Sequence, residues 1–224
     1  SAYLTNQIDD SALGQVGYRD SDRDAIPDPI DTAPVLQVQL DQPAGGGRPV
    51  LSGLAERARA AYLPAYRIET FTRVPDALLA PLCACMSRVE SDAPSGELEW
   101  EEEALTPERL RGFAELDEHV GRLRITSVAR EAESGEVVGY TELFIIGGTT
   151  KALQSGTFVV SEHRGHRLGL GLKVANLVAL QTYRPDAVEI FSINNAENTW
   201  MVAVNEELGF EPVELVGQFY RQLP

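Results

Sequence analysis

Apolar and polar positions alternate with two different periods along most of the chain. Runs with an apolar residue at every second position indicate strands, and runs with apolar residues three or four positions apart indicate helices. Strands are expected at residues 66–72, 122–130, 137–146, 156–160 and 187–193, with one or two closing strands at 212–223. Helices are expected at residues 51–62, 75–89, 106–119, 168–183 and 198–208. This alternation predicts an α/β (α+β) fold in which helices cover a sheet.

The first 50 residues have a different composition, in which Asp, Pro, Gly and Ser are frequent. The stretch from Asp41 to Pro49 contains three consecutive glycines between two prolines and indicates a flexible linker. Val35 to Leu40, just before it, alternates as a short strand would. We therefore divide the chain into an irregular acidic segment, residues 1–50, and a folded domain, residues 51–224.

Oxygen-bearing side chains recur at regular spacing in the acidic segment. A calcium loop of about twelve residues takes ligands from positions one, three, five, seven, nine and twelve, with a main-chain carbonyl at the seventh. The residues at these positions are Asp20, Asp22, Asp24, Ile26, Asp28 and Asp31. Ala25 replaces the usual Gly, and Asp31 replaces the usual Glu. A structural calcium site is one interpretation, and an acidic disordered tail is the other.

Charge and composition limit the partners. The formal net charge is −15, from 34 acidic and 19 basic side chains, and no basic run offsets it, so we expect no nucleic-acid partner. The acidic surface would attract cationic small molecules, although acidity also serves solubility. No apolar run is long enough for a membrane span and no signal pattern opens the chain, so we expect a cytoplasmic protein without a membrane partner. Cys83 and Cys85 fit neither a zinc nor a redox spacing and are expected to be buried free thiols.

The most informative stretch runs from Thr157 to Gly171, where an apolar strand enters a glycine-containing turn and a long helix begins. The first backbone N–H groups of a helix lack partners within it and lie at the positive end of its dipole, so they favour an anion. Glycine lets the backbone approach a ligand closely, and nearby Arg and His side chains add positive character. A diphosphate suits this turn, whereas a plain strand, loop and helix with incidental glycines is the alternative.

This stretch resembles the acyl-CoA motif of the GNAT superfamily, which reads Arg or Gln, two residues, Gly, one residue, then Gly or Ala. Arg164 and Gly169 match its first and last fixed positions, and Arg167 stands where the family usually has Gly. A second register, on Gly169 and Gly171, would put His166 in the leading place. We favour the register that begins at Arg164.

A later segment resembles the same family. Asn198 opens a predicted helix that ends in Leu208, Gly209 and Phe210, and the family's later helix begins at an Asn near the pantetheine and ends in Leu-Gly-Phe. The two motifs follow the family's order, and the resemblance covers about residues 66–224. It implies a mixed, twisted central sheet flanked by helices, with acetyl-CoA as co-substrate.

The resemblance also implies the contacts of the acetyl-CoA. Phe158 and Val159 would offer backbone groups to the pantetheine arm, which adds itself as an extra strand, and Asn198 would lie near that arm. The diphosphate would lie on the turn and the helix opening, at Arg164, Gly165, His166, Arg167, Leu168, Gly169 and Leu170.

Acyl transfer to an amine needs a neutral amine, a stabilised oxyanion and, where it helps, a proton for the leaving thiolate. The family usually has its acid, a Tyr, at the position of Asn205, which cannot act as an acid. Either the thiolate leaves unassisted or Tyr220 on the closing strand protonates it. For the base we expect Glu142, which apolar residues flank on its strand; a solvated Glu142, a water chain and the carboxylate of Pro224 are the alternatives.

These observations predict an N-acetyltransferase that transfers an acetyl group from acetyl-CoA to an amine of a small molecule, directly in a ternary complex. The alternative is a non-catalytic acyl-CoA-binding or pairing domain of a tandem GNAT protein, in which Asn205 and Arg167 mark lost catalysis. Residues 86–117 are expected to build the acceptor pocket. A homodimer is common in such folds and is left open.

Overall fold

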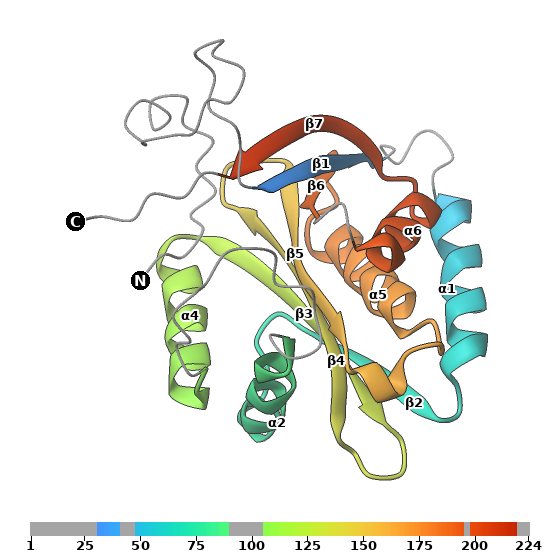
Figure 1. Cartoon of the computed structure of the whole chain (residues 1–224). Helices are drawn as coiled ribbons and strands as arrows, with labels where there is room; N and C mark the ends of the chain where they lie inside the picture. The colour runs from blue at the N-terminus through green and yellow to red at the C-terminus, as the bar shows by residue number, and fades with distance from the viewer. Residues whose placement is uncertain (1–30, 41–47, 90–104, 195–197, 219–224) are drawn as a thin grey trace.

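The computed structural model describes residues 31–40, 48–89, 105–194 and 198–218. Seven strands form one twisted sheet in the order β2-β3-β4-β5-β6-β1-β7 (Figure 1). Neighbouring strands are antiparallel except β5 and β6, which are parallel. The strands are β1 Asp31–Gln39, β2 Tyr66–Phe71, β3 Arg122–Glu131, β4 Val137–Ile146, β5 Lys151–Val159, β6 Glu189–Ile193 and β7 Glu211–Gln218.

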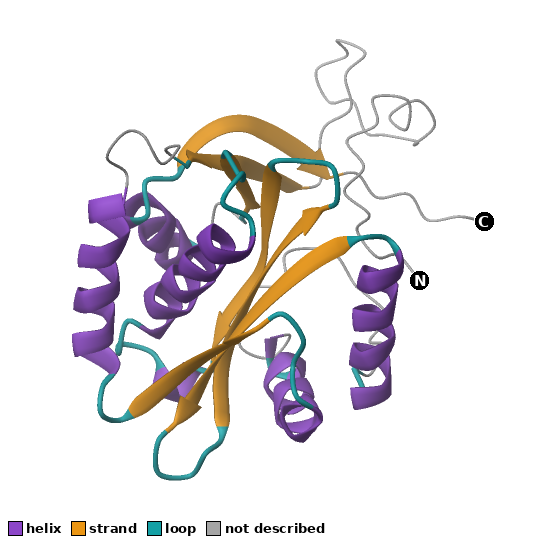
Figure 2. Cartoon of the chain, turned by 180° about the vertical axis from the view of Figure 1, so that it is seen from behind, coloured by secondary structure: helices purple, strands orange, loops and turns teal. Residues whose placement is uncertain are grey.

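Helices cover both faces of this sheet (Figures 1 and 2). On one face α5 packs against β2 to β5, and α1 packs against α5. α6 lies on the same face, whereas α2 and α4 cover the other. The helices are α1 Arg48–Tyr62, α2 Asp76–Ser87, α4 Pro107–His119, α5 Leu168–Tyr183 and α6 Thr199–Glu207, with a 3₁₀ turn, η2, at Ser161–His163. The predicted fold class is confirmed, and no helix in the described ranges is long and apolar enough to span a membrane.

A buried polar side chain fixes α5 on the sheet. Asn176 is fully buried, and its Nδ2 donates to the carbonyl oxygens of Ile125 (3.1 Å) and Thr141 (3.4 Å). Its Oδ1 accepts a hydrogen bond from Ser127 Oγ at 2.5 Å. A buried amide needs such partners because it has lost its water. These contacts join α5 to β3 and β4 and so set the position of the helix opening at the end of the sheet.

Apolar side chains fill both layers between sheet and helices. On the α5 face, Leu170 and Leu177 belong to a buried cluster with Ile125 and Ile190 of the sheet. On the other face, α2 contributes Cys85 to a second buried cluster. Cys83 and Cys85 are buried free thiols, as predicted, and burial raises the pKa of Cys85 to about 12.

β1 lies inside the sheet, although the sequence places it before the linker. It pairs with β6 from Val35↔Ile193 to Gln39↔Glu189 and with β7 from Asp31↔Gln218. Pro34 lies just before the ladder with β6 begins, where the missing N–H of proline breaks no bond to that strand. Residues 31–39 therefore belong to the folded unit, despite the boundary that we expected at residue 50. Residues 20–30 of the predicted calcium loop lie outside the described residues, and Asp31 is the first residue of β1.

Candidate active site

β5 and β6 separate at one end of the sheet. Their parallel ladder runs from Lys151↔Glu189 to Gln154↔Ser192, and β5 then continues to Val159 without further β6 partners in the described part of the chain. β5 begins at Lys151, five residues before the predicted strand at 156–160. The ladder with β6 holds these additional residues in the sheet. The separation leaves one edge of β5 available beside the helix opening.

A register shift in β5 accompanies this separation. Thr141 pairs with Thr157 and Leu143 pairs with Gln154, so Glu142 has no partner residue in β5. The Gln154 side chain is buried, and its Nε2 donates to the Glu142 carbonyl oxygen (2.6 Å) and to Thr141 Oγ1 (2.9 Å). The side chain therefore satisfies the carbonyl that the shift removes from the ladder.

The turn after β5 leads into α5, whose N-terminus has no side-chain cap. Gly165 has φ 87° and Arg167, the N-cap residue, has φ 56°, so both adopt left-handed conformations. The first helical bond runs from Gly171 N to Arg167 O at 2.9 Å, and no side chain caps the helix. The amides of Leu168, Gly169 and Leu170 therefore point out of the helix end without helical acceptors. These are the amides at which the sequence analysis expects a diphosphate.

The two helical glycines near this opening have different surroundings. A Cβ added to Gly169 would meet no atom within 4 Å. A Cβ added to Gly171 would lie 2.8 Å from Ile68 Cδ1 and 2.9 Å from Tyr62 Cε1. Gly171 therefore serves the packing of α5 against α1 and β2, whereas Gly169 faces open space. This difference favours the register that begins at Arg164.

Several side chains of the turn already have partners. Arg164 Nε donates to the Val159 carbonyl oxygen at 3.0 Å. The Arg167 guanidinium forms an ion pair with both carboxylate oxygens of Glu207 at the end of α6, and so lies against α6. His163 Nδ1 lies 3.1 Å from Tyr66 Oη, a contact that the sequence gave no means to predict.

Phe158 and Val159, the two residues predicted to contact the pantetheine arm, lie at the end of β5 and face different neighbours. A Cβ on Gly139 of β4 would lie 2.9 Å from the Phe158 carbonyl oxygen, so that carbonyl faces β4. Only glycine permits this close approach of β4 and β5. The Val159 carbonyl accepts from Arg164, and the Phe158 ring is buried on the α2 face. Of the two predicted backbone contacts, Val159 is therefore the one beside the turn.

The motif of the later helix has a local structural cause. Asn198 is the N-cap of α6, and its Oδ1 accepts from Met201 N at 3.2 Å. Gly209 has φ 83° and ends the helix in the left-handed conformation. Leu208 and Phe210 on either side are buried in the cluster on the α5 face. The Leu-Gly-Phe pattern thus ends the helix and attaches it to the core.

A lysine and an asparagine lie buried between α5 and α6. Lys173 Nζ donates to Asn205 Oδ1 at 2.6 Å and lies 5.7 Å from the centroid of the Phe210 ring. Both side chains are essentially inaccessible to solvent. We did not predict this pair, although the sequence held a signal: Lys173 shares a face of its helix with Leu170, Leu177 and other apolar residues.

Glu142 lies on the opposite face of the sheet, in a polar network. Its Oε1 accepts from Thr126 Oγ1 (3.2 Å) and its Oε2 from Arg124 Nη1 (3.3 Å). Arg124 Nε donates to Asp117 Oδ2 of α4 at 2.6 Å. The two carboxylates and the guanidinium form a partly buried cluster beneath α4. Tyr220 and Pro224 lie outside the described residues.

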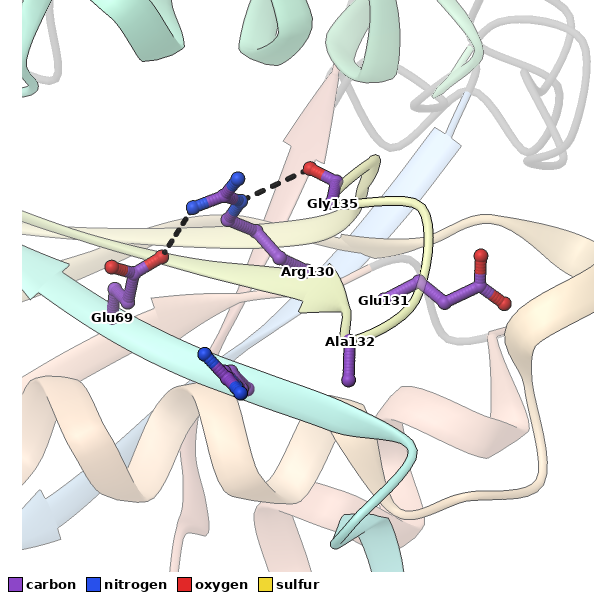
Figure 3. Close-up of a pocket in the computed structure, with 6 residues that line it drawn as sticks. Glu69, Arg130, Glu131, Ala132 and Gly135 are labelled. Atoms are coloured by element: carbon purple, nitrogen blue, oxygen red, sulfur yellow. Dashed lines mark hydrogen bonds and ion pairs between the residues drawn. The ribbon is translucent and has the colours of Figure 1, made fainter.

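Two hollows occur away from this site. The smaller, about 90 Å³, lies by the β3–β4 turn, where Arg130 bridges Glu69 (3.1 Å) and the Gly135 carbonyl oxygen (3.0 Å) (Figure 3). The larger, about 430 Å³, lies between α1 and α5. The smaller is lined by no residue that we predicted for the site, and the larger is lined by Gly171, which belongs only to the second register. Across the described ranges, no group of three or more His, Cys, Asp or Glu side chains is placed to hold a metal ion.

Comparison with solved structures identifies the architecture. A tandem GNAT protein from the clavulanic acid biosynthesis pathway superposes with a TM-score of 0.59 at 23% identity, over 83% of this chain and 51% of that protein. A GCN5-related N-acetyltransferase from Sphaerobacter thermophilus gives 0.51 at 18% identity, over 84% and 50%. The fold is that of the GNAT acetyltransferases. The chain thus spans about half the length of these two proteins.

A third GNAT neighbour was solved with a ligand. The yncA protein of Salmonella typhimurium, with its cofactor acetyl-CoA, gives a TM-score of 0.50 at 14% identity, over 70% of this chain and 98% of that protein. No protein-family model matches the sequence, and comparison with curated proteins finds no match. The GNAT fold is therefore established by structural similarity.

Proposed function

We propose that this protein is an acyl-CoA-dependent N-acyltransferase that transfers an acetyl group from acetyl-CoA to an amine of a small molecule. The observation that carries this proposal is the uncapped opening of α5, with Gly169 facing open space, beside the edge of β5 that β6 leaves. An opening of this kind supplies several N–H donors to a phosphate group at no steric cost. The supply of acetyl-CoA would place the reaction in the cytoplasm.

The residues of the turn divide the binding task in this proposal. The amides of Leu168, Gly169 and Leu170 would hold the diphosphate, with Gly165 shaping the turn, Arg164 adding positive charge and the His166 ring adding a hydrogen-bond donor. The backbone of Val159 would lie along the pantetheine arm, and Asn198 near it. Acetyl-CoA supplies the activated acetyl group as a thioester. The chain's own contribution is to hold that group beside the acceptor amine in a ternary complex.

The acceptor would approach from the face covered by α2 and α4. Asp117 and Glu142 are paired there with the guanidinium groups of Arg122 and Arg124, so this cluster carries no net charge of its own. The net charge of −15 of the chain would attract a cationic amine. Glu142 is then the proposed base and Tyr220 the proposed acid. A protein that binds acyl-CoA without transfer is the second candidate, which the Asn at position 205 favours.

Calorimetry with acetyl-CoA tests the proposal. Gly169→Leu would place a side chain in the open space beside the helix opening, so we expect acetyl-CoA affinity to fall by at least about tenfold. Gly112→Leu in α4 is the matched control, because its Cβ also meets no atom within 4 Å. Both variants should fold, since leucine favours helix more than glycine.

Turnover then separates the two candidates. Release of free thiol is followed over a panel of small amines with wild-type protein. Binding with turnover supports the acetyltransferase, and binding without turnover supports the non-catalytic candidate. Wild-type protein that binds no acetyl-CoA would remove both.

A further inference from the structure

The larger hollow, between α1 and α5, has no role in the proposed acetyl transfer. Its volume of about 430 Å³ lies within the range of small-molecule sites, which is about 300–1,000 Å³. α1 and α5 form its long sides, and Thr70 of the edge strand β2 also lines it (Figure 1). Its lining residues on α5 range from Gly171 to Tyr183, which corresponds to roughly 18 Å of helix. A hollow of this length suits an extended small molecule.

Small side chains leave this space open. Each helix presents two alanines to the hollow: Ala55 and Ala58 on α1, and Ala175 and Ala179 on α5. The packing is tight at Gly171, since a Cβ added there would lie 2.9 Å from Tyr62 Cε1. Further along the two helices, methyl groups face the hollow without filling it. Protein interiors are otherwise close-packed, so an apolar molecule in the hollow would supply dispersion contacts that the alanines lack.

The end of the hollow near Gly171 carries two polar groups that are available to a ligand. Arg59 and Tyr62 are three residues apart on α1 and so lie on the same face of the helix. Within the described part of the chain, neither side chain forms a hydrogen bond, and Arg59 pairs with no carboxylate. Burial raises the pKa of Tyr62, and the charge of Arg59 opposes this rise, so the hydroxyl is a donor at neutral pH. Two donors therefore meet at this end.

The rest of the hollow is apolar. Among the described residues that line it, only Arg59 is charged. At the far end, Val178 is 47% exposed and Tyr183 is 55% exposed. Large apolar side chains that are exposed beside a hollow indicate a surface that gains from being covered. The hollow thus combines a cationic end with an apolar length.

We propose that this hollow binds a small carboxylate with an extended apolar body. The carboxylate accepts hydrogen bonds from the Arg59 guanidinium and the Tyr62 hydroxyl, and the body lies over the alanines toward Tyr183. The charge is assigned by complementarity, because a guanidinium binds a carboxylate through two parallel hydrogen bonds and repels a cation. The inference does not depend on the acetyl transfer, because none of these residues belongs to the turn after β5.

Calorimetry with decanoate tests the proposal. Decanoate has a carboxylate and an apolar chain, decyltrimethylammonium has the same chain with the opposite charge, and acetate has the carboxylate without the chain. We expect one decanoate to bind per protein, and each of the other two compounds to bind at least about tenfold more weakly. Absence of decanoate binding, or equal binding of decanoate and the cation, overturns the inference.

Two pairs of variants locate the bound molecule. Arg59→Gln should weaken decanoate binding at least about tenfold, whereas Arg57→Gln, at an arginine that does not line the hollow, should leave it within about threefold. Ala55→Leu fills the hollow and should also weaken binding. Ala60→Leu, at an exposed position of α1 outside the hollow, is its control. Decanoate that binds equally to wild type and Arg59→Gln contradicts the proposed site.

Methyl NMR on wild-type protein decides even where a variant does not fold. Decanoate should shift the alanine methyl signals of the hollow and leave that of Ala114 in α4, on the other face of the sheet, unchanged. These shifts should persist when acetyl-CoA is added. Displacement of decanoate by acetyl-CoA overturns the inference, because the hollow would then belong to the acetyl-CoA site. A protein that binds decanoate and no acetyl-CoA supports the inference and contradicts only the proposed function.

Discussion

Arg167 begins α5 in a left-handed conformation that arginine adopts with difficulty. Its φ of 56° brings the Cβ of an L-residue close to the backbone, which costs roughly 1–2 kcal/mol, and glycine avoids this. The GNAT pattern has Gly at this position, and the structure supplies the physical reason. The ion pair with Glu207 compensates in part, since the Arg167 side chain is 44% exposed and such pairs contribute about 0–1 kcal/mol.

Two substitutions isolate this conformational cost. Arg167→Ala and Arg167→Gly both remove the ion pair, but only glycine relaxes the backbone. We expect Arg167→Gly to be more stable than Arg167→Ala by about 1 kcal/mol in urea unfolding. Equal stability of the two variants would contradict the left-handed conformation at this residue.

Lys173 should make stability depend on pH. Its folded pKa of about 7 lies below the ordinary lysine value, so the unfolded chain binds more protons between those two values. Its contribution to stability is therefore lowest near pH 7 and below, and rises as pH increases toward the unfolded value. The described groups that face it, Asn205 and Phe210, do not titrate in this range.

The comparison variant is Lys173→Met, which removes the titration and the buried charge. We expect the stability of wild type relative to Lys173→Met to increase by roughly 4 kcal/mol between pH 7 and pH 10. Urea unfolding at several pH values measures this difference. The ε-carbon NMR signals of Lys151 and Lys173 report directly which lysine titrates early. A pH-independent difference between the two proteins would contradict a buried, unpaired Lys173.

Contacts between residues far apart in the sequence could not be predicted. Gly169 and Gly171 are both glycines in one helix, and only their neighbours in space distinguish open room from tight packing. Lys173 and Asn205 are 32 positions apart, so their contact depends on how α5 and α6 meet. The helix opening after β5 was predictable because it is local: a strand, a turn and a helix are consecutive in the chain.

Among the elements, α5 links the sheet to the site. Its range was predicted as observed, since leucines and valines repeat at helical spacing from residue 168 to 183. The early part of β5 was not predicted because the polar Gln154 stands at an inward position. A buried Gln is tolerated at that position because the shifted register leaves the Glu142 carbonyl oxygen unpaired, and the Gln154 side chain donates to it.

The attachment of α5 to the sheet should depend on Asn176. Asn176→Ala removes contacts to Ile125, Ser127 and Thr141 and leaves buried polar groups unpaired. We expect a loss of about 3 kcal/mol in the free energy of unfolding. Thr182→Ala, on the exposed side of the same helix, should change it by less than about 0.5 kcal/mol. Chemical denaturation measures both, and similar effects would argue against the buried network.

For the whole molecule, the sheet depends on a strand from the N-terminal part of the chain. β7 pairs only with β1 among the described strands, and Val35 and Leu36 of β1 are buried. The expected boundary at residue 50 followed composition, which reports the local linker. Composition does not reveal that a strand before the linker pairs with strands much later in the sequence.

Two truncations test this dependence. A chain that starts at Asp31 keeps both ladders of β1, and we expect a cooperative thermal transition. A chain that starts at Arg48 loses both ladders and exposes the edges of β6 and β7, so we expect an unfolded or aggregated product. Circular dichroism and size-exclusion chromatography distinguish these results. A folded monomer from the shorter chain would show that β1 is dispensable.

The placement of β1 also constrains synthesis on the ribosome. β1 is made before any other described element, whereas its partners β6 and β7 are the last two described strands, so Asp31 can pair only after Gln218 has been made. Pairings between such distant segments form slowly, and an unpaired strand is exposed to aggregation in the meantime. The nascent chain would thus carry β1 as an unpaired strand until β7 has been made, and helper chaperones have most to protect during that interval.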